Sequence, residues 1–167
     1  MTIAVGDRIP EVTVQVPSPE GPRAVSSTEL LGSGRVVLFG VPGAFTPTCS
    51  DYHLPGFVLR ADELRQAGVD TIACLAVNDA FVMEAWGQAQ GVGDGVTLVA
   101  DGSAALTHAL GLDVDLTGGG LGIRCRRFAA VLEDGVVTDL AVEDKPGLDV
   151  SSAESVLTRL RARPHAG

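Results

Sequence analysis

Short apolar runs and helical spacings alternate over the first two thirds of the chain. Strand patterns, either alternating or continuously apolar, cover residues 12–16, 35–41, 71–77 and 96–100. Helical spacings cover residues 57–67, about 78–90 and 103–110. Gly68 stands where the first of these helices should end, and Asn78 is a residue type typical of a helix N-terminus. This order predicts a βαβ series with parallel strands.

The last third of the chain changes to a hairpin followed by one helix. Residues 127–132 and 136–142 have strand patterns and flank 133–135, whose sequence Glu-Asp-Gly is a hairpin signal. A final helix is predicted from about Ser151, because Ser151 and Glu154 have the spacing of a capping box. Parallel strands with an antiparallel hairpin at one side predict an α/β, thioredoxin-like fold, with a central mixed sheet flanked by helices.

Composition limits the classes of protein to which the chain can belong. With 167 residues, 46% of them hydrophobic, we expect one domain over residues 1–167. A net charge of -9 argues against nucleic acid or an anionic membrane surface as a partner. Residues 1–10 do not resemble a secretion signal, and no apolar run has the length of a membrane span. We therefore expect a cytoplasmic protein.

Three cysteines, Cys49, Cys74 and Cys125, stand at wide spacings, which favours reduced thiols over a disulfide framework. Cys49 differs from the other two because it ends the sequence Val-Pro-Gly-Ala-Phe-Thr-Pro-Thr-Cys at a predicted helix start. The unpaired N–H groups and the positive dipole end of a helix favour an anion, so a thiol placed there ionises more readily. Cys49 is therefore the candidate nucleophile.

Residues 39–49 resemble the active-site segment of peroxiredoxins, specifically the peroxiredoxin 5 or type II branch that includes the plant proteins. Further similar segments cover residues 53–57, 77–82, 100–103, 107–111 and 126–128. The resemblance implies a thiol-dependent peroxidase that reduces hydrogen peroxide and organic hydroperoxides. In this chemistry the peroxidatic cysteine, here Cys49, becomes a sulfenic acid. We expect no cofactor and no metal.

Two neighbours of Cys49 are candidates for catalytic roles. Thr46 lies three positions before Cys49, and its hydroxyl both donates and accepts hydrogen bonds. We expect Thr46 to orient the peroxide while touching the thiolate. Pro42 matches the active-site proline of the family and should shield the sulfur from water and from overoxidation.

An arginine from the distant hairpin should hold the thiolate ionised and contact the peroxide. Arg124, Arg126 and Arg127 are the candidates. The family match places the arginine directly before the aromatic residue that opens the strand. Arg127 precedes Phe128, and strand alternation sends Arg126 to the opposite face, so Arg127 is the prediction.

His53 has two interpretations. It follows Cys49 by four positions and could face it across one helical turn. Alternatively, its imidazole packs beside Pro55 without a role in the chemistry.

The sequence leaves three candidates for the thiol that reduces the sulfenic acid. Cys74 matches the second cysteine of plant-type members, where that residue has been assigned as the resolving cysteine, but it lies in an apolar strand where a thiol is normally inert. Cys125 would qualify only if exposed beside Arg124 and Arg126. The third source is external: glutaredoxin with glutathione, another low-molecular-weight thiol, or thioredoxin.

The resemblance also implies a homodimer, with Pro42, Phe45 and Phe81 as candidate apolar contacts. Other classes remain as alternatives. A thiol–disulfide oxidoreductase would need a second cysteine where Thr46 stands. A metal module built on Cys49 and His53 lacks a second pair of ligands. The intact set of Thr46, Cys49 and Arg127 argues against a catalytically silent interaction domain.

Overall fold

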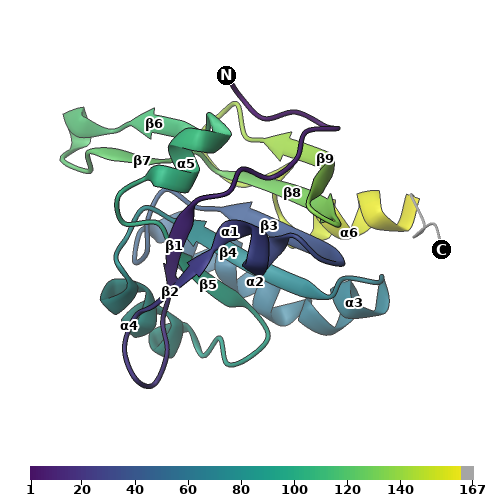
Figure 1. The fold of residues 1–167 in the computed structure, drawn as a ribbon, viewed down its shortest axis with the longest axis horizontal. Coiled ribbons are helices and arrows are strands. Elements are labelled where there is room, and N and C mark those ends of the chain that lie inside the picture. The colour runs from purple at the N-terminus through teal and green to yellow at the C-terminus, as the bar shows by residue number, and fades with distance from the viewer. Residues whose placement is uncertain (163–167) are drawn as a thin grey trace.

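A seven-stranded mixed sheet forms the centre of the computed structural model, which describes residues 1–162 (Figure 1). The strand order is β2-β1-β5-β4-β3-β8-β9. β3, β4 and β5 run parallel, and the pairs β1–β2, β1–β5, β3–β8 and β8–β9 are antiparallel. The strands are β1 (Thr13–Val16), β2 (Arg23–Ser26), β3 (Arg35–Gly40), β4 (Thr71–Ala76), β5 (Thr97–Ala100), β8 (Phe128–Glu133) and β9 (Val136–Val142). The predicted α/β fold with a mixed sheet is confirmed.

Helices cover both faces of this sheet. They are α1 (Ser27–Leu31), the π-helix η1 (Cys49–His53), α2 (Leu54–Leu59), α3 (Ala61–Gln66), α4 (Ala80–Gln90), α5 (Ala105–Leu110), the short 3-10 helix η2 (Thr117–Gly119) and α6 (Ala153–Ala162). Apolar residues of α2, α3, α4 and α6 share one core cluster with Val37 and Phe39 of β3. Residues of α1 and α5 share a second cluster with Val36 and Leu38. The alternation along β3 therefore supplies both cores.

A two-stranded ribbon, β6 (Asp113–Asp115) paired with β7 (Ile123–Cys125), stands apart from the main sheet. Figure 1 shows it on the opposite side of the molecule from α6. Sequence patterns predicted neither ribbon strand, nor β2, nor α1. Each contains at most two apolar residues, which is too few for a hydrophobic period to become visible, whereas the pattern recognised at β1 extends over Val12, Val14 and Val16.

β3 is an interior strand of the sheet, between β4 and β8, and all six of its residues are buried. It ends at Gly40, which pairs with Phe128 of β8. A Cβ at Gly40 would overlap the Phe128 ring and approach Cys125 Sγ to 2.8 Å. Glycine therefore lets β8 and the end of β7 close over the point where β3 leads into the Cys49 loop.

The predicted helix over 57–67 is two helices, because the backbone of Arg60 (φ -101°, ψ 14°) leaves the helical region between α2 and α3. Helical structure begins at Cys49, as predicted for that residue, and continues through residues 54–56 into the segment whose helical spacing was recognised from residue 57. The predicted hairpin is confirmed: Glu133 pairs with Val136 around a two-residue turn. Asp134 and Gly135 have φ values of 50° and 82°, as a type I′ turn requires.

Two predicted helix starts are wrong by one or two residues. Asp79, not Asn78, caps α4, and its Oδ1 accepts from Val82 N at 2.9 Å. α5 begins at Ala105 rather than Ser103, where the buried Asp101 carboxylate accepts two backbone N–H groups. At each helix start, the capping side chain is therefore the one that the backbone directs toward the unpaired N–H groups of the first turn.

The capping box predicted from Ser151 and Glu154 is also wrong. Ser152 directly precedes α6, and its Oγ accepts from the backbone N–H of Ser155 in the first turn of that helix at 3.1 Å. Glu154 instead forms an ion pair with Arg60 at 2.6 Å. Ser151 is thereby left for other contacts.

None of the helices formed by residues 1–162 combines the length and the hydropathy that a membrane span requires.

Candidate active site

Cys49 lies at the first position of η1, at the end of the loop that leaves β3. Its surface is 0% exposed. The N–H of Leu54 donates to Cys49 O, a five-residue step that makes this turn a π-helix. Next to Cys49, Ser50 Oγ accepts from the indole Nε1–H of buried Trp86 at 3.0 Å. The helix carrying the thiol is thus tied to α4.

Arg127 reaches the sulfur from the start of β8. Its Nη2 donates to Cys49 Sγ at 3.1 Å, and its Nη1 lies 2.9 Å from His53 Nδ1. Gly40 and Phe128 pair in the sheet, so the residue before Phe128 lies next to the loop that follows Gly40. Of the three arginines considered from the sequence, Arg127 is the one that contacts Cys49.

The other two arginines lie elsewhere. Arg124 donates from Nη1 to Pro42 O at 3.1 Å and from Nε to Leu121 O at 2.9 Å. The side chain of Arg126 is exposed. Arg124 therefore supports the loop that carries Pro42 and does not contact the sulfur.

His53 is fully buried, and the ring packs 4.9 Å from Phe39 and 5.6 Å from Phe57, measured between centroids. An arginine side chain only donates, so Nδ1 must accept from Arg127. The proton is then on Nε2, which donates to Ser151 O at 2.9 Å. Burial, followed by the charge of Arg127, lowers the pKa of His53 to about 3. The imidazole is therefore neutral, and it contributes both packing and an acceptor that orients Arg127.

Behind Ser151 lies a carboxylate that the sequence patterns did not indicate. Glu143 Oε2 accepts from Ser151 N at 2.9 Å, from Ser151 Oγ at 2.7 Å and from Asp149 N at 2.8 Å. Burial opposes ionisation, yet the N–H and O–H donors from Asp149 and Ser151 hold the pKa of Glu143 below its ordinary value. Ser151 stands 98 residues from His53, so local sequence carried no signal for this link.

The loop between β3 and η1 is held by hydrogen bonds at three points. Thr46 Oγ1 donates to Gly43 O at 2.7 Å, and Asn78 Oδ1 accepts from Ala44 N at 2.9 Å. The predicted contact between the Thr46 hydroxyl and Cys49 is not among the hydrogen bonds of residues 1–162. With its proton given to Gly43, the hydroxyl keeps its lone pairs as acceptors. Pro42 is half-buried, and Arg124 holds its carbonyl.

All three cysteines are free and buried. Cys74 pairs with Phe39 in the sheet and belongs to the same core cluster as Cys49. Burial, and then the nearby Cys49, raises the pKa of the Cys74 thiol well above its ordinary value. Burial likewise raises the pKa of Cys125, whose Sγ donates to Arg126 O at 3.1 Å. The exposure that a reactive Cys125 would require is absent.

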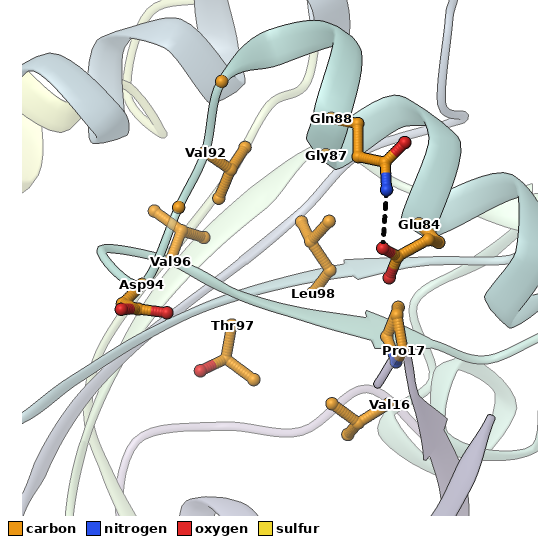
Figure 2. A pocket seen from close by; sticks show the side chains of 12 residues that line it. Val16, Pro17, Glu84, Gly87, Gln88, Val92, Asp94, Val96, Thr97 and Leu98 are labelled. Carbon is orange, nitrogen blue, oxygen red and sulfur yellow. Dashed lines mark hydrogen bonds between the residues drawn. The ribbon is translucent and has the colours of Figure 1, made fainter. Parts of the chain in front are cut away.

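Two cavities differ in their relation to this site. One, of about 490 Å³, is lined by Pro42 and Arg127 together with part of β6 and the chain that follows β9. The other, of about 460 Å³, lies between the C-terminal half of α4 and β5. Figure 2 shows Glu84 and Gln88 along one side of it, joined by a hydrogen bond, and Leu98 between them and Thr97. None of the predicted site residues lines this second cavity, so only the first borders the active site.

Known proteins match this chain in both sequence and fold. The family model described as Redoxin matches residues 4–157. Peroxiredoxin-2B of Arabidopsis thaliana is 49% identical over 159 residues, covering 95% of this chain and 98% of the relative. The chain belongs to the peroxiredoxins.

Further relatives extend the match. The chloroplastic Peroxiredoxin-2E-2 of Oryza sativa subsp. japonica is 49% identical, covering 95% of this chain and 73% of the relative. The crystal structure of reduced Prx3 in complex with hydrogen peroxide from Vibrio vulnificus superimposes with a TM-score of 0.91 at 47% identity, covering 95% of this chain and 99% of that one.

Peroxiredoxins are thiol-dependent peroxidases, and the function of this chain is therefore the reduction of a peroxide substrate at the expense of a thiol. This family membership favours a peroxidase over the alternatives of a thiol–disulfide oxidoreductase and a silent interaction domain. Within the part of the chain that the structure describes, no group of three or more His, Cys, Asp and Glu residues is placed to hold a metal ion.

Proposed function

We propose that Cys49 is the peroxidatic cysteine of this peroxiredoxin and that Arg127 holds its thiolate. The observation that supports this assignment is the 3.1 Å contact between Arg127 Nη2 and Cys49 Sγ. A fixed guanidinium charge at this distance favours the anionic sulfur. The thiolate attacks one peroxide oxygen, the O–O bond breaks, and the products are a sulfenic acid and water or an alcohol.

Thr46 and Pro42 shape the path of the peroxide. The Thr46 hydroxyl donates to Gly43, so its role is to accept from the O–H of the peroxide rather than to touch the thiolate. Pro42 borders the cavity beside Arg127 and shields the sulfur from water. Because Arg124 holds the carbonyl of Pro42, this shield is fixed in place.

Hydrogen peroxide and organic hydroperoxides are the proposed substrates. The structure of the Vibrio vulnificus relative with hydrogen peroxide supports the first. The cavity of about 490 Å³ beside Arg127 supports the second, because its lining includes apolar Pro42, Val114 and Leu116.

An external thiol is the proposed reductant of the sulfenic acid. The two other cysteines are buried, and burial holds both thiols in their protonated, weakly nucleophilic form. Glutaredoxin with glutathione, another low-molecular-weight thiol and thioredoxin are the candidate donors. An internal disulfide between Cys49 and Cys74 is the second candidate route, since both thiols belong to one core cluster.

We also propose a homodimer that acts in the cytoplasm and is built from one domain over residues 1–167. Phe45 and Phe81 are 56% and 72% exposed. Burying these aromatic side chains against a second copy of the chain would remove apolar surface from water. Sedimentation of the wild type and of a Phe81→Lys variant tests the dimer. A wild type that sediments as a monomer would contradict it.

Peroxide consumption by a Cys49→Ser variant tests the catalytic assignment. Reduced protein is mixed with about one equivalent of hydrogen peroxide, and Trp86 fluorescence follows the oxidation, because Trp86 is bonded to Ser50 beside the thiol. We expect the fluorescence change and the peroxide loss to disappear in Cys49→Ser and to persist in Cys125→Ser. Unchanged peroxide loss in Cys49→Ser overturns the assignment.

Mass spectrometry of the oxidised protein tests the route of reduction. A sulfenic acid at Cys49 that is trapped by dimedone, and that disappears on addition of a thiol, supports the external route. A peptide crosslinked through Cys49 and Cys74 supports the internal route instead.

A further inference from the structure

The chain between β9 and α6 is folded around one carboxylate. Glu143 Oε2 receives three donors, all from Asp149 and Ser151, at 2.7 to 2.9 Å. These bonds close the loop onto itself and set the direction in which the Ser151 carbonyl points. Ser151 has no exposed surface, so this carbonyl lies in the interior.

The Ser151 carbonyl leads to the sulfur through three hydrogen bonds. It accepts from His53 Nε2 at 2.9 Å, Arg127 Nη1 lies 2.9 Å from His53 Nδ1, and Arg127 Nη2 donates to Cys49 Sγ at 3.1 Å. The direction of every bond is set by chemistry, because a carbonyl only accepts and a guanidinium only donates. A shift of the carbonyl therefore turns the ring and moves the arginine.

We propose that Glu143 is a positioning residue for the peroxidase reaction, which acts on Cys49 through Ser151, His53 and Arg127. The inference rests on the proposed function of Cys49. The donors to the Glu143 carboxylate come from Asp149 and Ser151, and it forms no hydrogen bond with the sulfur. Its carboxylate fixes the loop, and the loop fixes the acceptor that aims the guanidinium at the thiolate.

The sign of the effect separates positioning from through-space electrostatics. Removing the negative charge of Glu143 would, by Coulomb interaction alone, favour a thiolate at Cys49 and leave the reaction as fast or faster. Loss of positioning has the opposite effect, because a misdirected Arg127 stabilises the thiolate less. The charged and titratable groups near the carboxylate are Asp149 in its own loop, His53, and the side chains that line the same cavity, which are Arg126, Arg127, Asp144 and Lys145.

The test compares Glu143→Gln with Asp149→Asn in the full chain. Gln keeps an acceptor oxygen but loses the charge, whereas Asp149→Asn removes one charge from the same loop and keeps the backbone N–H that Glu143 binds. We expect the rate constant with hydrogen peroxide to fall about tenfold in Glu143→Gln and to change less than about twofold in Asp149→Asn. We also expect iodoacetamide to alkylate Cys49 with a higher pH midpoint in Glu143→Gln.

A Ser151→Ala variant provides a second measure should Glu143→Gln fail to fold, because it removes one of the three donors and keeps the carbonyl. We expect its rate constant to fall about threefold. A Glu143→Gln protein that reacts at the wild-type rate, or whose alkylation midpoint moves to lower pH, overturns the inference. If Cys49→Ser still consumes peroxide, the proposed function itself fails, so the two failures are distinguishable.

Discussion

Arg127 and Cys49 are 78 residues apart in sequence, yet Arg127 Nη2 lies 3.1 Å from Cys49 Sγ. The contact exists because β8 pairs with β3, which brings the residue before β8 beside the loop that follows β3. His53 completes the arrangement by accepting from the other terminal nitrogen of the same guanidinium. A planar fork with two partners has one orientation, which is why the identity of this residue as arginine matters.

Replacement of Arg127 by lysine should therefore strongly slow the reaction with peroxide, although the positive charge is kept. An ammonium group cannot donate to Cys49 and His53 in the fork geometry, so one preorganised donor is lost. We expect the rate constant for hydrogen peroxide to fall by about two orders of magnitude in Arg127→Lys. Stopped-flow measurement of Trp86 fluorescence gives this rate. Arg161→Lys, on the surface of α6, is the control, and a wild-type rate in Arg127→Lys would contradict the argument.

Asn78 should control the shape of the Cys49 loop. Its Oδ1 accepts from Ala44 N at 2.9 Å, and removing the side chain leaves a largely buried N–H without its partner. We expect Asn78→Ala to react with peroxide about tenfold more slowly. Gln88→Ala removes a side-chain amide whose partner lies on the same helix, and it should keep the wild-type rate. Equal rates in both variants would show that the loop holds its shape without Asn78.

His53 should make the stability of the protein depend on pH. Its pKa is lowered to about 3 in the folded chain, from 6.5, mainly by burial and next by Arg127. Between pH 6.5 and about pH 3 the unfolded chain binds a proton at His53 that the folded chain excludes. The contribution of His53 to the free energy of unfolding is therefore fully present above pH 6.5 and decreases as the pH falls through this range. The expected loss is about 1.4 kcal/mol per pH unit from this group.

Urea unfolding at pH 7, 6 and 5 measures this loss. A His53→Gln variant should lack the contribution, whereas His108→Gln, whose side chain is 82% exposed, should keep the wild-type slope. A wild type as stable at pH 5 as at pH 7 would rule the prediction out.

Gly40 should be required for packing at the end of β3. A methyl group there would overlap the Phe128 ring and press on Cys125 Sγ, and neither neighbour has free space. We expect Gly40→Ala to lower the free energy of unfolding by about 1 to 3 kcal/mol, measured by urea denaturation. Gly118→Ala is the matched control, because no atom lies within 4 Å of the added Cβ. Equal stability of the two variants would refute this account of Gly40.

Long periodic elements were predictable from the sequence because their patterns are local. The central strands, the helix of α4 and the hairpin turn at Asp134 and Gly135 were recognised from spacing and turn residues. Helix starts were less certain, because Asn78 and Asp79 are both good capping residues and only the backbone direction decides between them. Asn78 is used instead on Ala44, in a loop that precedes it by more than thirty residues.

The sequence by itself determined the fold class and the family, and it indicated Cys49 as the candidate nucleophile. Strand and helix periods, and the segment that ends at Cys49, are properties of neighbouring residues. Only the tertiary structure decided what holds Arg127 against the sulfur, and it shows the Thr46 hydroxyl donating to Gly43 O. Hydrogen bonds between Arg127, His53, Ser151 and Glu143 join β8, η1 and the chain before α6. Such contacts depend on how distant elements pack, which no local pattern records.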